Sequence, residues 1–192
     1  MSIDLSLFSL EGKTALITGS SQGIGFALAK GMYNAGANII LNGRDLSKLK
    51  LAQKKFKYQD KVKVSNFDVT SYEETINSIS ELEHSFNSID VLVNNAGIQF
   101  RSPLEDFPIE KFEEIINTNI KSLFNVSKNI VKFMIKRKKG KIINIASVQS
   151  SLARPGIAPY TASKGAVANF TKGMATDWAK YGIQVNAIAP GY

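Results

Sequence analysis

Short apolar segments alternate with longer amphipathic segments along the chain, and this alternation constrains the fold more than any other feature of the sequence. The short segments are rich in Ile and Val, as β-strands are, and the longer ones repeat apolar residues with helical period. Strands that alternate with helices form a parallel sheet with helices on both faces. Strands that are apolar throughout fit such a sheet, because both of their faces are buried.

The predicted elements form a regular series without repeats, linkers or low-complexity segments. The six strand-like segments read KTALITG, ANIILNG, VKVSNFD, DVLVNNAG, GKIINIAS and IQVNAIAPG. The predicted helices lie near residues 23–35, 46–57, 71–87, 109–137 and 160–181. We therefore expect residues 1–192 to form a single α/β domain with a three-layer architecture.

Composition narrows the class of protein. The chain is 44% hydrophobic and 21% charged, as ordinary globular proteins are. It has no cysteine, so disulfides and thiolate chemistry are excluded, and no metal site is expected. No apolar stretch is long enough to span a bilayer, and the N-terminal residues do not form a secretory signal. We expect a cytoplasmic protein without a membrane partner.

The net charge of +8 raises the question of a polyanionic partner. The basic residues gather in KKFKYQDKVKV and KRKKGK, at the ends of predicted helices and in turns. Cations stabilise the C-terminal ends of helices through the helix dipole. Few aromatic residues interrupt these runs, although stacking on bases would need them. Solvated helix ends explain the charge, and no nucleic-acid partner is expected.

A glycine-rich segment, TGSSQGIG, follows the first predicted strand and opens the first predicted helix. Gly19, Gly23 and Gly25 are spaced as G-x-x-x-G-x-G, which differs from the common G-x-G-x-x-G dinucleotide motif. The physical reasoning is the same for both spacings. Glycines allow the backbone to approach a pyrophosphate, and the helix N-terminus offers N–H donors and positive potential. Such turns also occur without a ligand, so this motif alone is weak evidence.

Polar residues follow the other predicted strands at their carboxyl ends. They are Arg44, Asp68, Asn94–Gly97, Ser147 and Pro190–Gly191. In an open α/β sheet, ligands bind at the edge formed by the carboxyl ends of the strands. The repetition of polar residues at this edge favours a ligand site over ordinary turn chemistry.

Two further features place polar groups on predicted helices. Tyr160 and Lys164 are four residues apart and therefore share a helical face. Asn119 falls inside the apolar stripe of the helix predicted at 109–137, where its amide needs hydrogen-bond partners. Each feature alone also fits an ordinary helix, with a solvated lysine in one case and a local backbone hydrogen bond in the other.

Taken together and in this order, TGSSQGIG, NNAG, Asn119, Ser147, Tyr160 and Lys164 resemble the short-chain dehydrogenase/reductase family over residues 8–192. Within the family, NNAGIQFRSPLEDFP and INIASVQSSLARPGIAPYTASKGAV are most similar to gluconate 5-dehydrogenases. The resemblance implies a Rossmann-like doubly wound parallel sheet in strand order 3-2-1-4-5-6. It also implies hydride transfer between a nicotinamide and a secondary alcohol or ketone, here gluconate and 5-ketogluconate.

The resemblance implies a catalytic role for four residues. Tyr160 would exchange a proton with the substrate oxygen, and Lys164 would lower the tyrosine pKa, which is ordinarily near 10. Ser147 would hydrogen-bond the substrate oxygen and stabilise the charge that develops there. Asn119 would hold a water molecule that connects Lys164 with solvent, and Lys164 would also contact the nicotinamide ribose.

The same resemblance implies the cofactor site. No acidic residue stands at position 42 or 43, whereas Arg44 can pair with a phosphate, so NADP(H) is expected in preference to NAD(H). Asp45 comes one residue later and is expected to cap the next helix, which leaves NAD(H) as the alternative. The expected cofactor residues are Gly19, Ser21, Gln22, Gly23, Ile24, Gly25, Arg44, Asp68, Val69, Asn95, Ala96, Gly97, Tyr160, Lys164, Pro190 and Gly191, and Asn94 is expected to line the same cleft.

For the substrate, the expected contacts are Ser147, Gln149 and Tyr160, with Arg101 or Arg154 as the counter-charge for a carboxylate. Two alternatives stay open at this point. A reductase of 3-oxoacyl thioesters would use the same catalytic residues, and a positively charged surface could attract its acidic carrier protein. A non-catalytic nucleotide-binding protein of the same fold is the alternative of another class.

The resemblance has two further implications. Family members pair through their two long helices, so a homodimer through residues 109–137 and 160–181 is expected. Family members also continue beyond the position of Tyr192 into a helical lid over the substrate and a seventh strand. We therefore expect the 192-residue chain to be poorly soluble or slow in turnover, because exclusion of water and positioning of the substrate depend on such lids.

Overall fold

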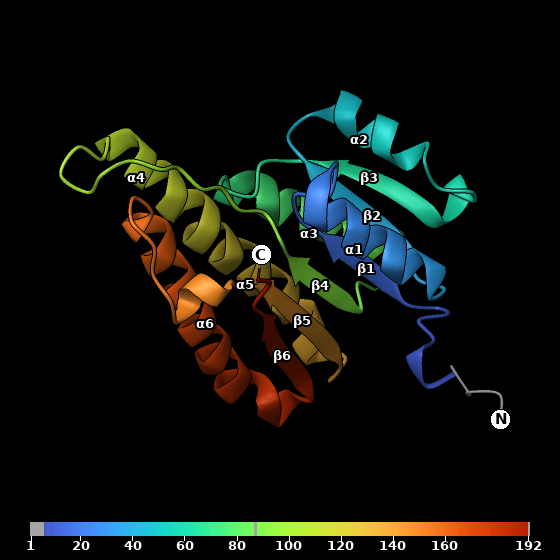
Figure 1. Cartoon of the computed structure of the whole chain (residues 1–192). Coiled ribbons are helices and arrows are strands. Elements are labelled where there is room, and N and C mark those ends of the chain that lie inside the picture. The colour runs from blue at the N-terminus through green and yellow to red at the C-terminus, as the bar shows by residue number, and fades with distance from the viewer. Residues whose placement is uncertain (1–5, 87, 192) are drawn as a thin grey trace, which may run out of the picture.

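One parallel sheet of six strands organises the structure, a computed structural model that describes residues 6–86 and 88–191 (Figure 1). The strand order is β3-β2-β1-β4-β5-β6, and all five neighbouring pairs are parallel. The predicted fold class and strand order are therefore confirmed. The strands are β1 (Thr14–Ile17), β2 (Asn38–Gly43), β3 (Val62–Asn66), β4 (Val91–Asn94), β5 (Gly140–Ile145) and β6 (Ile183–Ile188).

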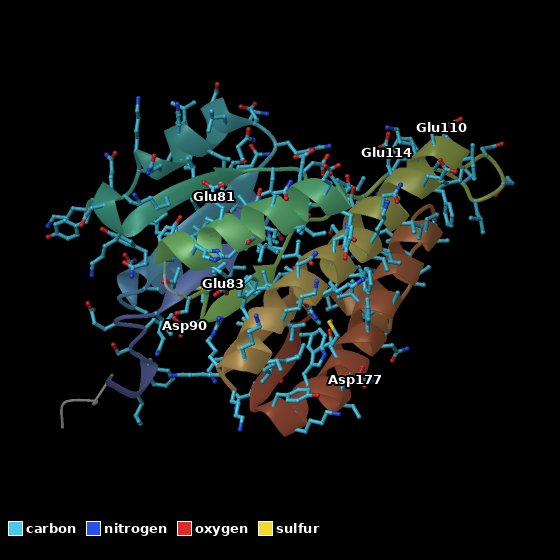
Figure 2. All side chains as sticks on the ribbon, turned by 180° about the vertical axis from the view of Figure 1, so that it is seen from behind. Glu81, Glu83, Asp90, Glu110, Glu114 and Asp177 are labelled. Atoms are coloured by element: carbon cyan, nitrogen blue, oxygen red, sulfur yellow. The ribbon has the colours of Figure 1, made fainter. Side chains whose placement is uncertain are left out.

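The helices form a layer on each face of the sheet. Helices α1 and α2 lie on one face, and α3, α5 and α6 lie on the opposite face, which Figure 2 turns toward the viewer. The helices are α1 (Gly23–Asn34), α2 (Leu46–Gln53), α3 (Tyr72–Phe86), α4 (Ile109–Ile116), α5 (Ser122–Lys136) and α6 (Ala158–Trp178).

Two buried apolar clusters hold these layers together. One joins β-strand residues to Ile79 of α3, Ile130 of α5 and Val167 of α6. The other joins the opposite faces of the strands to Ala29 of α1 and Leu49 of α2. Because successive strand residues point to opposite faces, Leu16 enters the first cluster while Ala15 and Ile17 enter the second.

The helix predicted at 109–137 is interrupted by a π-helical turn. Helix α4 ends at Ile116, the π turn η3 spans Asn117–Lys121, and α5 then begins at Ser122. The backbone at Asn117 and Ser122 stays in the right-handed helical region, so the rod continues through the turn. A π turn inserts one residue into a helix and is frequent at functional sites. Here it contains Asn119.

Other helix boundaries differ modestly from the prediction. Helix α2 ends at Gln53 rather than near residue 57, because the chain then turns before β3. Helix α6 begins at Ala158, two residues before Tyr160, and carries a proline in its first turn, where the missing N–H is harmless. The far end of α6 continues as a short 3-10 turn before β6.

The sheet is incompletely covered at β5 and β6. A shallow depression there is lined by Lys141, Ile142, Ile143, Gln184, Asn186 and Ile188. The side chain of Ile188 is 48% exposed. None of the helices in the described part of the chain has the length and apolarity that crossing a membrane requires.

Candidate functional site

A cavity of about 610 Å³ lies at the carboxyl ends of the strands. The ends of all six strands, or the loops that follow them, contribute to its wall. The cavity brings together Ser147 and all sixteen residues that the sequence predicted for a cofactor, from Gly19 to Gly191.

The glycine-rich turn between β1 and α1 is shaped by close backbone contacts. Gly19 has a φ of 60°, which residues other than glycine rarely adopt. A Cβ there would lie 3.0 Å from the Cα of Ala96. A Cβ on Gly25 would lie 2.4 Å from the Asn95 Nδ2 atom and 2.5 Å from the Gly19 carbonyl oxygen. Both glycines are therefore required for the packing of the turn, and the first turn of α1 faces the cavity.

The glycine-rich turn is attached to the loop after β4 by a set of hydrogen bonds. The Asn95 side chain donates from Nδ2 to the carbonyl oxygens of Thr18, at 2.9 Å, and Gly19, at 3.0 Å. The Thr18 hydroxyl in turn accepts from the backbone N–H groups of Asn95 and Ala96. These bonds fix the glycine-rich turn against the loop after β4, and both segments contribute to the cavity wall.

The outer end of the cavity, defined here by Arg44, Asp45, Lys48 and Asp68, is charged and exposed. The Arg44 guanidinium lies 3.9 Å from the Asp68 carboxylate, whose other oxygen accepts from the N–H and hydroxyl of Thr70 at 2.8 Å each. Asp45 caps α2, as predicted, by accepting from the Lys48 backbone N–H at 3.0 Å. Two cations, Arg44 and Lys48, thus lie on the wall at this end.

The inner end of the cavity, defined here by Ser147, Tyr160 and Lys164, is mostly buried. Asn119 lies off the cavity wall and is bonded to the wall residue Ile98. Lys164 is 5% exposed, and its Nζ atom donates to the Ile145 carbonyl oxygen at 2.6 Å. The same Nζ atom lies 5.8 Å from the centre of the Tyr160 ring. Burial lowers the pKa of Lys164 from 10.5 to about 8. The lysine therefore remains mostly protonated at neutral pH beside the phenol.

Ser147 follows β5 by two residues and contributes to the cavity wall. It caps the short 3-10 helix η4 (Val148–Ser150), because its Oγ atom accepts from the Gln149 backbone N–H at 3.1 Å. Ser150 of the same turn donates to the Lys164 carbonyl oxygen at 2.8 Å. The turn that holds Ser147 is thus bonded directly to the helix that carries Tyr160 and Lys164.

Asn119 is buried, as its place in the apolar stripe predicted, and its side chain makes three hydrogen bonds. Its Oδ1 atom accepts from the Ile98 N–H at 2.8 Å, and its Nδ2 atom donates to the Ile98 carbonyl at 3.0 Å and to the Ser163 hydroxyl at 2.9 Å. Ser163 then donates to the Tyr160 carbonyl at 2.7 Å. The amide therefore fastens the loop after β4 to α6 beside the cavity.

Several predicted residues lie outside the cavity wall. Asn94 was expected to line the cleft, but it is buried beneath it and donates to Ser127 and Asn144. Gln149 is also buried, and neither Arg101 nor Arg154 lies on the wall. The two arginines are exposed, on neighbouring loops that are joined by a bond from the Ser102 N–H to the Gly156 carbonyl.

Other residues on the cavity wall were not expected from the sequence: Asn42, Gly43, Asp45, Lys48, Phe67, Thr70, Ile98, Gln99, Thr118, Ile145 and Ala146. Most of them adjoin an expected residue in the sequence. Lys48 does not, because it reaches the cavity from the first turn of α2. The predicted cap at Asp45 was the signal that could have identified it, since a cap at Asp45 places Lys48 in the first turn beside it.

The doubly wound sheet, the glycine turn, the buried Ser147 and Lys164 and the partly buried Tyr160 have the arrangement of a dinucleotide-binding oxidoreductase site at the carboxyl edge of the sheet. The family model for short chain dehydrogenases matches residues 13–192, and the chain belongs to this family. It is therefore a nicotinamide-dependent oxidoreductase that acts on CH–OH groups.

Within this family, the chain is similar to several curated proteins and solved structures. The chain is 51% identical over 187 residues to gluconate 5-dehydrogenase of Gluconobacter oxydans, covering 97% of this chain and 73% of that protein. It is 47% identical over 188 residues to 5-keto-D-gluconate 5-reductase of Escherichia coli K12, covering 97% and 74%. A crystal structure of a gluconate 5-dehydrogenase from Burkholderia cenocepacia with NADP and tartrate has a TM-score of 0.95 at 47% identity, covering 99% and 75%.

Proposed function

We propose that this chain binds NADP(H) and interconverts gluconate and 5-ketogluconate. The observation that carries the proposal is the group of Tyr160 with the buried Ser147 and Lys164 on the wall of a cavity that also contains the glycine-rich turn. The relatives that act on gluconate or 5-ketogluconate by name support the substrate, at 51% and 47% identity.

The residues at the inner end are suited to proton transfer. In the reductive direction, the Tyr160 phenol gives its proton to the ketone oxygen and becomes a phenolate, which the Lys164 ammonium stabilises. The Ser147 hydroxyl donates to the same oxygen and stabilises the charge that develops there. When bound, the reduced nicotinamide supplies the hydride for the ketone carbon. Oxidation of the alcohol reverses each of these transfers.

The side chain of Asn119 has a positioning role in this arrangement. Its bonds to Ile98 and Ser163 keep the loop after β4 in place beside Tyr160 and Lys164. That Asn119 also holds a water molecule for Lys164 stays a prediction. Gly97 of this loop leaves room for them, since a Cβ there would lie 3.3 Å from Asn119 Oδ1 and 3.7 Å from Lys164 Nζ.

The preference for NADP(H) rests on the outer end of the cavity. Asn42, at the end of β2, is buried and donates its amide hydrogens to the carbonyls of Ser65 and Phe67. It carries no charge that would repel a 2′-phosphate, and Arg44 and Lys48 lie beyond it on the cavity wall. The relative from Burkholderia cenocepacia was solved with NADP. Direct titration with NADPH and NADH tests this preference.

The substrate is tested by comparing NADPH oxidation with 5-ketogluconate and with an acetoacetyl thioester. We expect turnover with the sugar acid. Turnover with the thioester alone would favour the acyl reductase, and binding of NADPH without turnover of either would favour a non-catalytic protein. Arg101 is our candidate for the substrate carboxylate. Arg101→Ala should raise the KM for 5-ketogluconate severalfold while NADPH affinity holds, and Arg154→Ala is the matched comparison.

We also propose that two copies associate through the outer surfaces of the long helices. Phe112 of α4 and Phe124 of α5 are 40% and 42% exposed. Phe124 stacks on Phe170 of α6, with ring centres 6.2 Å apart, so the exposed aromatic surface crosses from α5 to α6. Light scattering of the purified chain should give the mass of a dimer, and Phe124→Asp should reduce it to that of a monomer.

A further inference from the structure

A chain of four buried polar side chains lies beneath the inner end of the cavity. The Asn94 Nδ2 atom donates to the Ser127 hydroxyl at 2.8 Å and to the Asn144 Oδ1 atom at 2.9 Å. The Asn144 Nδ2 atom donates to the Thr171 hydroxyl at 2.9 Å, and this hydroxyl donates to the Val167 carbonyl. All four side chains are at most 6% exposed, so the chain links β4, α5, β5 and α6 inside the core.

Hydrogen bonds and apolar contacts place a helix on a sheet in different ways. Val167 and Met174 of α6 pack into the apolar cluster, but dispersion contacts are not directional and tolerate small slips. A hydrogen bond requires a heavy-atom separation near 2.9 Å and a suitable angle. Losing one inside a core leaves an unpaired polar group, which is costly. The bond from Asn144 to Thr171 therefore resists sliding of α6 along β5.

Two side-chain hydrogen bonds join α6 to consecutive residues of β5. One is Asn144 to Thr171, and the other is Lys164 to the Ile145 carbonyl. Lys164 and Thr171 are seven residues apart, which is close to two helical turns, so both face the same strand. The bond in the core and the bond in the cavity thus depend on the same register between the helix and the strand.

We propose that Asn144 and Thr171 are positioning residues that fix the register of α6 on β5 and thereby hold the Lys164 Nζ atom at the Ile145 carbonyl. The proposal rests on the proposed function in one respect, namely that the Lys164 ammonium stabilises the Tyr160 phenolate during turnover. A misplacement of about 1 Å can reduce catalytic rates by as much as about a hundredfold, so a small slip of the helix would be visible in turnover.

Two variants of Thr171 separate its hydroxyl from its volume. Thr171→Val has nearly the same volume but leaves the Asn144 amide without its acceptor, whereas Thr171→Ser keeps the acceptor. Ser127→Ala is the matched control, because it removes a buried hydrogen bond of the same network on the side of α5 and leaves the bond to α6 in place. Thr171→Ala repeats the test if valine prevents folding.

The direct measurement is an NMR titration of lysines labelled at Cε, with the Lys164 signal assigned by Lys164→Arg. Its midpoint is expected near 8, because burial lowers the pKa of Lys164, whereas exposed lysines should titrate near 10.4. Other titratable groups on the same cavity wall are Arg44, Asp45, Lys48, Asp68 and Tyr160, and of these Tyr160 lies at the inner end. Comparing each variant with the unmutated protein cancels their common contribution.

In Thr171→Val and Thr171→Ala, the Lys164 midpoint should rise toward 10.5 by about half a unit or more, because the displaced ammonium gains contact with water. Turnover should fall about tenfold while NADPH affinity changes less than about twofold. Thr171→Ser should restore both values, and Ser127→Ala should lower the unfolding temperature without moving the midpoint.

An unchanged Lys164 midpoint in both Thr171→Val and Thr171→Ala would overturn the positioning role. A shift of equal size in Ser127→Ala would overturn it as well. The titration does not require turnover. If the unmutated protein reduces no ketone, the proposed function fails, and the midpoint still decides whether Asn144 and Thr171 hold Lys164.

Discussion

The two ends of the cavity are built in opposite ways. At the outer end, the side chains of Arg44 and Lys48 are 76% and 61% exposed, and each lies nearly 4 Å from a carboxylate. At the inner end, Lys164 is 5% exposed and bonded to a carbonyl at 2.6 Å. Exposed ion pairs contribute little and rearrange readily, whereas buried groups keep one geometry.

This difference assigns different tasks to the two ends. The outer cations can leave their carboxylates for a phosphate at small cost, so they should set affinity and cofactor choice. The inner groups are aligned before the substrate arrives, so they should set the rate. Substitutions at the inner end are therefore expected to have large effects on turnover, and those at the outer end to have small effects on binding.

The largest effect is expected for Tyr160→Phe. The change removes the proton donor and keeps the ring, so kcat should fall by about a hundredfold to ten-thousandfold. NADPH affinity should stay within about twofold, because the outer contacts are intact. Stopped-flow NADPH oxidation measures the rate and fluorescence titration the affinity. Tyr181→Phe, in the 3-10 turn that follows α6, is the control, and a comparable loss of rate there would argue against a special role for Tyr160.

The next largest effect concerns stability, because burial of the Lys164 ammonium at the inner end lowers the free energy of unfolding. The folded pKa of Lys164 is lowered to about 8, so the unfolded chain binds this proton more tightly than the folded chain does. The contribution of the lysine to stability is most favourable above pH 10.5 and is lost as the pH falls to about 8. The full penalty, roughly 3 kcal/mol at most, then applies at neutral pH.

Lys164→Met should therefore abolish turnover and raise the free energy of unfolding at pH 7. The gain should shrink as the pH rises from 8 toward 10.5, and it is reduced by the loss of the bond to Ile145, worth about 1 kcal/mol. Urea unfolding at pH 7 and pH 10 measures the difference. Lys172→Met, exposed on the same helix, should show no such dependence. A lower free energy of unfolding for Lys164→Met than for the unmutated protein at pH 7 would mean that burial of the lysine ammonium does not destabilise the folded chain.

The sequence predicted the two ends unequally well. Residues of the outer end and of the glycine turn could be placed because they immediately follow strands, and the carboxyl ends of parallel strands share one edge. The burial of Asn119 followed from helical periodicity. Its partners Ile98 and Ser163 did not, since they come from distant segments that only packing brings together. The same reason hid the network around Asn94, whose partner Asn144 is fifty residues away.

The π turn at Asn117–Lys121 was also missed. Its backbone angles stay close to those of an α-helix, and its residues continue the apolar stripe, so the hydrophobic pattern of 109–137 does not reveal it. Sequence periodicity reports which face of a helix is buried. It does not report an inserted residue that shifts the face by part of a turn.

At the outer end, Arg44→Ala should weaken NADPH binding by about tenfold to a hundredfold, the range for one charge-assisted hydrogen bond, and leave NADH binding nearly unchanged. Turnover at saturating NADPH should hold, which is the opposite of the result for Tyr160→Phe. Isothermal titration with both nucleotides measures the change. Lys180→Ala removes a positive charge remote from the cavity and is the control. Tighter binding of NADH than of NADPH by the unmutated protein would reverse the cofactor assignment.

The smallest effect is expected at Lys48. Asp45 holds both ends of this residue, accepting from its backbone N–H at 3.0 Å and lying 3.7 Å from its ammonium. The backbone hydrogen bond from Lys48 lowers the pKa of Asp45, so the carboxylate is ionised at neutral pH and competes with a phosphate for the ammonium.

Lys48→Ala should weaken NADPH binding about two- to threefold, and Asp45→Asn should strengthen it by a similar factor while still capping α2. Both changes should disappear near 1 M salt, where charges more than about 3 Å apart are screened. Identical affinities for the three proteins at low salt would leave Arg44 as the cation at this end that distinguishes the two nucleotides.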